Sequence, residues 1–128
     1  MITTSSESNA YRTIFSSGAH KAIADAPVAK GGGGAGFDPH ELLEAALATC
    51  INIVVRKRAD QLAIAVDGVA VIVRLDRSPP EVVSFEYELI LHGSINAEQR
   101  ALLNAVVKSC PVSQTLSKQI VFREIEKP

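Results

Sequence analysis

Two cysteines, Cys50 and Cys110, are the residues of this 128-residue chain whose types best suit redox chemistry. They lie sixty positions apart, which is neither the short paired spacing of a zinc site nor the dense spacing of a secreted disulfide framework. A free cysteine in a folded protein is most often a small buried hydrophobic residue. The residues alone therefore leave two interpretations open, namely two structural cysteines or a working thiol pair.

The two cysteines have different predicted surroundings. Cys50 falls in an apolar segment, where a packed thiol is inert unless a cation lies nearby. Cys110 directly precedes Pro111, at the predicted N-terminus of a short helix, and the helix dipole favours a thiolate there. Taken alone, Cys110 is therefore predicted to be the more activated thiol.

A glycine-rich segment at residues 31–36 holds five of the eight glycines of the chain. It satisfies the pattern G-x-G-x-x-G, but any run of glycines does so, and the residues before it are a poor parallel strand. No Gly-Lys-Ser/Thr sequence follows it. We therefore predict a mobile surface loop here and not a nucleotide-binding loop.

The remaining polar residues point to no cofactor and no metal. The three histidines, His20, His40 and His92, lack metal-ligand spacing. The net charge of −1 provides no basic field for nucleic acid.

Residues 42–55 are the longest apolar stretch, and they are too short to cross a bilayer. With no secretory signal at its start, the chain is expected to be a cytoplasmic single domain over residues 1–128.

A long helix is predicted to carry Cys50. Asp38 suits the N-cap position, Pro39 suits the first turn, and the helix should run to about Asp60. Apolar residues cover nearly its whole circumference, which is typical of a helix buried on all sides. Because one small domain has little material to cover such a helix, we expect a second subunit to contribute.

The other elements predict an α+β fold in the order ββ-α-ββ-α-β. A hairpin is expected within residues 11–25, and antiparallel strands are expected at 68–76 and 81–93. Asn96 and Gln99 form a capping-box pattern at the start of a helix over 97–108. A short helix should begin at Pro111, and a last strand is predicted over 119–126.

Two segments together resemble the OsmC/Ohr family of osmotically inducible and organic-hydroperoxide-resistance proteins, over nearly the whole chain. They read GAHKAIADAPVAKGGGGAGFDPHELLEAALATC and KSCPVSQTL. The resemblance implies an OsmC-like fold, with antiparallel sheets wrapped around central helices in an intertwined homodimer. It also implies a thiol peroxidase with its sites at the dimer interface.

Carried onto this chain, the resemblance makes Cys50 the peroxidatic thiol and Cys110 the resolving thiol. It implies an organic hydroperoxide substrate and a dithiol reductant such as dihydrolipoyl groups. The family activates its thiol with an arginine held by a glutamate, and Arg12 is the candidate arginine. Where the hydroperoxide-resistance branch has glutamate after the proline, this chain has His40, with Glu41 one position later. The expected apolar walls of the pocket are Phe37, Leu43 and Leu47.

On a regular helix, with about 100° per residue, Glu41 lies opposite Cys50 and His40 lies nearer to it. His40 is therefore the better-placed neighbour of the thiol. Two alternatives to the peroxidase remain. One is a non-catalytic OsmC-like protein that binds a small apolar molecule or serves a stress response. The other is a structural dimer with buried cysteines.

Overall fold

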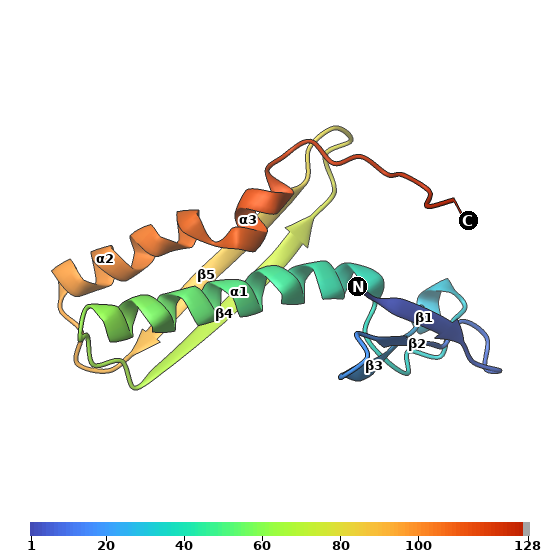
Figure 1. The fold of residues 1–128 in the computed structure, drawn as a ribbon, viewed down its shortest axis with the longest axis horizontal. Helices are drawn as coiled ribbons and strands as arrows, with labels where there is room; N and C mark the ends of the chain where they lie inside the picture. Colours follow the sequence, from blue (N-terminus) through green and yellow to red (C-terminus); the bar gives the residue numbers. More distant parts are fainter. Residues whose placement is uncertain (127–128) are drawn as a thin grey trace. The chain divides into compact units, whose positions relative to one another are not determined.

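A computed structural model describes residues 1–126 and confirms the mixed α+β class (Figure 1). The chain divides into two units, of which the first is Met1–Ala45 and the second begins at Ala46. No helix within the described part of the chain is both long and apolar enough to span a membrane. Each unit is described by itself below.

The first unit contains a three-stranded antiparallel sheet in the order β1-β2-β3. Its strands are β1 (Thr3–Ser6), β2 (Thr13–Ser16) and β3 (Lys21–Ala24). The β2–β3 hairpin confirms the predicted pair of strands, with Gly18 in its turn at a φ of 98°. The sequence reasoning missed β1, because its four polar residues show no apolar alternation.

The glycine-rich segment is packed against β3 and the residues after it, so the predicted mobile loop is corrected to an ordered one. Asp25 is buried, and its Oδ2 accepts backbone hydrogen bonds from Gly33 (3.2 Å) and Ala35 (3.0 Å). A Cβ atom on Gly36 would lie 2.1 Å from the carbonyl oxygen of Ile23. The glycines therefore allow close backbone approach.

Helix α1 (Pro39–Gln61) matches the predicted helix. The Asp38 carboxylate accepts the N–H of His40 (2.8 Å), and the Glu41 carboxylate accepts the N–H of Asp38 (2.9 Å). This reciprocal cap explains why the helix begins at Pro39. Within the chain, burial is confined to a stripe of residues four apart, Leu47, Ile51, Val55 and Ala59. The apolar Ile53 remains 46% exposed.

The second unit places α1 and α2 (Ala97–Val106) side by side on the hairpin of β4 (Gly68–Asp76) and β5 (Ser84–His92) (Figure 1). The register pairs Val71 with Leu89, and both pack against the buried cluster. Glu86 and Glu88 fall on the other face of the hairpin, because successive residues of a strand point to opposite faces. The side-chain amide of Asn52 donates to the Val69 carbonyl (2.9 Å), which ties α1 to β4.

The predicted capping box starts α2. Asn96 accepts the N–H of Gln99, and the Gln99 side chain accepts the N–H of Asn96. The helix was predicted to reach Lys108 as one element. Its last turn is instead a 3-10 helix, η2 (Val107–Ser109), which leads to α3 (Pro111–Leu116). Because proline disfavours helical geometry in the residue before it, Cys110 lies between these two elements.

The predicted last strand over residues 119–126 is wrong in the described chain, where this segment has no regular structure. Its apolar residues are exposed, with Phe122 at 92% and Ile125 at 91%. The apolar content is typical of a strand, but a strand also needs a neighbouring edge to pair with. The observed order of strands and α-helices is therefore βββ-α-ββ-α-α.

The core of the second unit is made by α1, β5, α2 and the segment around Cys110. Its fully buried side chains are large and aliphatic apart from one thiol, and they are Ile51, Leu103, Val55 and Cys110. Burial of such side chains is the main stabilising contribution to a unit of this kind. The core therefore fixes the position of one cysteine directly.

Candidate functional site

Cys50 and Cys110 meet inside the second unit, although sixty residues separate them in the sequence. The Cys50 side chain is half-buried on α1, and Cys110 is fully buried between η2 and α3. The two thiols are hydrogen-bonded to each other, and neither is in a disulfide. Hydrogen-bonded thiols lie close enough for sulfur–sulfur chemistry with modest movement.

The protonation of Cys110 is set mainly by its burial. Burial raises the pKa of the Cys110 thiol, and the hydrogen bond with Cys50 raises this pKa further. The backbone N–H groups of Ser113 and Val112, at the start of α3, lower the same pKa by a smaller amount. The prediction that Cys110 is the more activated thiol is therefore wrong, because desolvation outweighs the short helix. The raised pKa favours the protonated thiol of Cys110.

Arg12, the candidate activating cation, lies in the first unit, whereas both thiols lie in the second. Its guanidinium forms an ion pair with Glu7, with 3.6 Å between Nη1 and Oε2. Among residues 1–126, the described ion pairs join Arg12 to Glu7, His40 to Asp38 and Arg74 to Glu86. The structure thus identifies Glu7 as the partner of Arg12.

His40 and Glu41 both belong to the cap of α1. The Glu41 carboxylate accepts the N–H of Asp38, and His40 Nδ1 lies 3.7 Å from Asp38 Oδ1. These contacts are local to the start of the helix. Glu41 therefore has an observed structural role here.

The three residues expected to form apolar pocket walls differ in burial. Leu47 is buried in the core of the second unit. Phe37 and Leu43 belong to the first unit and are exposed. Of these three residues, Phe37 and Leu43 expose apolar surface to solvent within one chain, and Leu47 does not.

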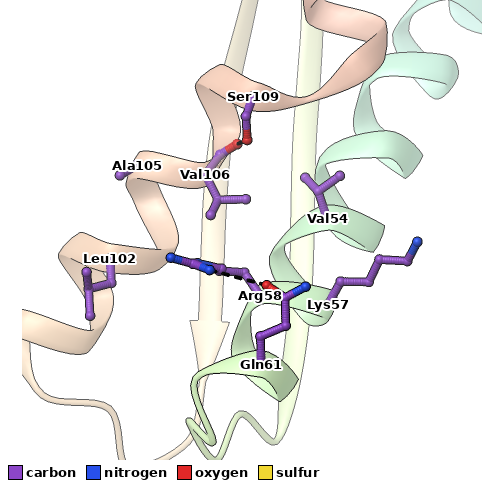
Figure 2. Close-up of a pocket in the computed structure, with 8 residues that line it drawn as sticks. All are labelled: Val54, Lys57, Arg58, Gln61, Leu102, Ala105, Val106 and Ser109. Carbon is purple, nitrogen blue, oxygen red and sulfur yellow. Dashed lines mark hydrogen bonds between the residues drawn. The ribbon is translucent and has the colours of Figure 1, made fainter.

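A groove of about 500 Å³ runs between α1 and α2 (Figure 2). Val54, one helical turn after Cys50, and Ser109, next to Cys110, both line it. The Arg58 guanidinium extends toward α2 and donates to Gln61 Oε1 (3.3 Å), while the ammonium of Lys57 points away (Figure 2). The sequence reasoning assigned no function to these cations. The sequence predicts the helix that carries these cations, but it does not show that α2 forms the opposite wall of the groove.

Asp25 and Glu7 were also missed as potential functional residues. A signal for Asp25 was present, because an aspartate before a proline and a glycine-rich segment can accept loop N–H groups. Glu7 lies before the predicted hairpin and had no such signal. Among the described residues, no group of three or more His, Cys, Asp or Glu side chains could hold a metal ion.

Comparison with known proteins gives a consistent family match. Residues 31–124 match the family model described as OsmC-like protein. A search of curated proteins finds no matching relative. Three solved structures that resemble the chain are each 22% identical to it, so they support the fold alone.

Three solved structures illustrate this likeness. A Psychrobacter arcticus 273-4 protein, assigned provisionally to the osmotic stress induced and detoxification response, has a TM-score of 0.75 and 22% identity, covering 89% of this chain and 85% of its own. An OsmC-like protein from Mycoplasma pneumoniae has a TM-score of 0.70 and 22% identity, and the match covers 91% of this chain and 85% of that protein. An organic hydroperoxide resistance protein OsmC from Legionella pneumophila has a TM-score of 0.66 and 22% identity, covering 91% and 88%.

Proposed function

Since the chain belongs to the OsmC-like protein family, we propose that it is a thiol-dependent peroxidase that reduces organic hydroperoxides. The observation that carries this proposal is the hydrogen-bonded contact between Cys50 and Cys110. Two structural cysteines have no need to meet, whereas a peroxidatic and a resolving cysteine must. The names of solved relatives that are called organic hydroperoxide resistance proteins support the same activity.

The different surroundings of the two sulfurs support different roles in this proposal. Cys110 is fully buried and holds its proton, so the thiolate that attacks peroxide is that of the more accessible Cys50. The Cys50 sulfur bonds to one peroxide oxygen as the O–O bond breaks, and the other oxygen leaves as an alcohol after taking a proton. Sulfur is oxidised to a sulfenic acid, and the peroxide is reduced.

Resolution then uses the adjacent thiol. Cys110 loses its proton and attacks the Cys50 sulfur, a disulfide forms, and the sulfenic oxygen leaves as water. A dithiol reductant, for which a lipoyl-type group is our candidate, returns both cysteines to thiols by exchange and becomes a disulfide itself. No cofactor enters this scheme.

Arg12 is the proposed activating cation, by the family resemblance. A positive charge beside a thiol favours the thiolate, which is the reactive form. His40 is no neighbour of the thiol within one chain, because ten residues of α1 place it about 15 Å from Cys50 along the helix axis. Phe37 and Leu43 are the candidate apolar walls for the organic part of the peroxide. Glu41 is retained only as a candidate, since its carboxylate already caps α1.

We also propose that the chain is a single domain and that it forms a homodimer with a second copy. Ile53 on α1 and the apolar residues of the 119–126 segment are exposed in the single chain. Burial of such surface against a second copy would be favourable. An unpaired segment with strand-like composition could also complete a sheet edge of that copy. Sedimentation equilibrium, with a variant truncated after Lys118, tests this proposal.

The peroxidase is tested by mixing the reduced protein with cumene hydroperoxide in a stopped-flow instrument and by counting the thiols that remain. The wild-type protein should lose both thiols and gain one disulfide. Cys50→Ser should not consume peroxide. Cys110→Ser is the matched control, because it should consume one equivalent and stop as a sulfenic acid that dimedone traps. A Cys50→Ser variant that reacts as fast as the wild type would refute the assignment.

A second candidate is a non-catalytic binding protein with this fold. One observation favours it: a groove of about 500 Å³ lies between α1 and α2, and Val54 and Ser109 are among the residues that line it. This candidate predicts a thiol pair inert to peroxide and an apolar ligand retained through purification. Native mass spectrometry of the reduced protein, combined with the kinetic experiment above, distinguishes the two functions.

A further inference from the structure

Two buried side-chain polar atoms in residues 1–126 have no hydrogen-bond partner, and both belong to the first unit. One is Nε of Arg12, and the other is Oδ1 of Asp25. Asp25 is only 5% exposed, and its other oxygen already accepts two loop N–H groups. A buried donor and a buried acceptor are each costly to leave unpaired, and buried charges are normally paired with one another.

The β2–β3 register, continued by one residue, would place these two residues opposite each other. Its last pair is Thr13 with Ala24, and Arg12 and Asp25 are the next residues on the two sides. On its other side, Thr13 pairs with Ser6, and the Glu7 N–H donates to the Arg12 carbonyl (3.0 Å), which continues that ladder to Arg12. Residues directly opposite in antiparallel strands project to the same face. The continued register would therefore set Arg12 in a row between Glu7 and Asp25.

Both carboxylates in this row suit a guanidinium. Glu7 already pairs with Nη1 of Arg12 at 3.6 Å. The unpartnered Oδ1 of Asp25 and the unpartnered Nε of Arg12 are a complementary acceptor and donor, and the described residues contain no ion pair between these two side chains. Arginine offers donors in a fixed planar fork, so two carboxylates on opposite sides restrict its orientation more than one does.

We propose that Glu7 and Asp25 are positioning residues for Arg12, holding its guanidinium from the strands on both sides. They would provide what the resemblance assigns to a helix glutamate, since Glu41 caps α1 in this chain. Asp25 also binds the N–H groups of Gly33 and Ala35, so the glycine-rich segment fixes one side of the arrangement. The catalytic consequence depends on the proposed function, whereas the pairing itself does not.

The pairing is tested on the full chain by nuclear magnetic resonance of the arginine Nε–H groups. The Arg12 signal is identified by its loss in Arg12→Lys. In the wild type, it should exchange slowly with solvent and shift downfield. Asp25→Asn keeps an oxygen for the loop N–H groups but removes the charge, and it should speed exchange by about tenfold, as expected for one charge-assisted hydrogen bond. An Arg12 signal unchanged by Asp25→Asn would overturn the Asp25 pairing.

Glu7→Gln provides the matching test on the other strand, and Glu44→Gln, an acidic residue of α1 outside this row, is the control. Exchange of the Arg12 Nε–H should be faster in Glu7→Gln and unchanged in Glu44→Gln. Equal effects in both variants would overturn the proposal for Glu7. Urea unfolding of every variant separates loss of the pairing from loss of the fold.

The catalytic consequence is tested by a double-mutant cycle on the rate of peroxide reduction. Asp25→Asn should slow the wild-type reaction by about tenfold or more, because misplacing a catalytic group is costly. In an Arg12→Gln background, the same substitution should have no further effect, which a merely structural role would not produce. Equal effects in both backgrounds would overturn the positioning role. A wild-type protein inert to peroxide would refute the proposed function, and the exchange measurements would still decide the pairing.

Discussion

The two units of this chain are stabilised in different ways. The second unit packs aliphatic side chains from two helices and a hairpin around Ile51 and Leu103, which are fully buried. In the first unit, short strands and a glycine-rich segment surround one buried carboxylate, that of Asp25. Apolar burial is tolerant of small shape changes, whereas backbone packed against backbone is not. The comparison shows that the placement of the thiols depends on apolar packing, whereas the order of the glycine-rich segment depends on hydrogen bonds and close backbone contact.

The largest expected effect is in the apolar unit. Ile51→Ala should lower the free energy of unfolding by about 2–5 kcal/mol, because it removes a fully buried side chain and leaves a cavity. Urea denaturation followed by circular dichroism measures this loss. Ile72→Ala, at a position 54% exposed on the hairpin, is the control and should cost less than about 1 kcal/mol. Similar losses for the two variants would contradict the assignment of the core.

The next effect tests the backbone packing of the first unit. A Cβ on Gly36 would lie 2.1 Å from the Ile23 carbonyl oxygen, so Gly36→Ala forces the backbone to move. We expect a loss of about 1–3 kcal/mol, seen as faster amide hydrogen exchange in β3. Gly33→Ala is the milder comparison, since its nearest atom would be Asp25 Oδ2 at 3.2 Å. Gly36→Ala with unchanged exchange would restore the idea of a mobile loop.

A smaller effect concerns polar contacts in the apolar unit. Asn96→Ala removes the acceptor of the Gln99 N–H at the start of α2, and it should cost about 1 kcal/mol. Thermal unfolding measures the change. Asn104→Ala makes the same exchange inside α2 and should not destabilise, because alanine has the higher helix propensity. If both variants lost the same stability, the capping box would not be the cause.

The smallest expected effect is a pH dependence from Cys110. Its pKa is raised in the folded state, so the unfolded chain releases this proton first as the pH rises. The free energy of unfolding should therefore decline from about pH 8.5, the ordinary range of cysteine, up to the raised pKa. Urea titrations of wild type and Cys110→Ala at several pH values should show a shallower decline in the variant. Parallel curves would contradict the raised pKa.

Local sequence signals predicted the helices well. Asp38 with Pro39, and Asn96 with Gln99, are contacts within one turn, and both helices begin where these residues placed them. The β2–β3 hairpin was predicted for the same reason, because its turn lies between two apolar runs. These elements depend on neighbours in the sequence.

Features that depend on distant residues were predicted less well. The 119–126 segment has the composition of a strand, but pairing requires an edge that no local pattern reveals. The activation of Cys110 was misjudged because its burial is created by α1 and α2, which a helix-dipole argument ignores. The family resemblance suggested that the two cysteines act together, and only the tertiary structure brings them into contact. The contact of Glu7 with Arg12 follows from the pairing of β1 with β2.

The buried stripe of α1 has a further consequence for how this helix forms. Leu47, Ile51, Val55 and Ala59 recur every four residues, so each step advances about 40° around the helix axis. A heptad seam drifts in the opposite sense and winds into a left-handed supercoil, which this stripe cannot follow. A synthetic peptide of α1 should therefore not form a coiled coil with a straight partner helix through this stripe. The stripe instead packs in one buried cluster with residues of β4, β5 and α2.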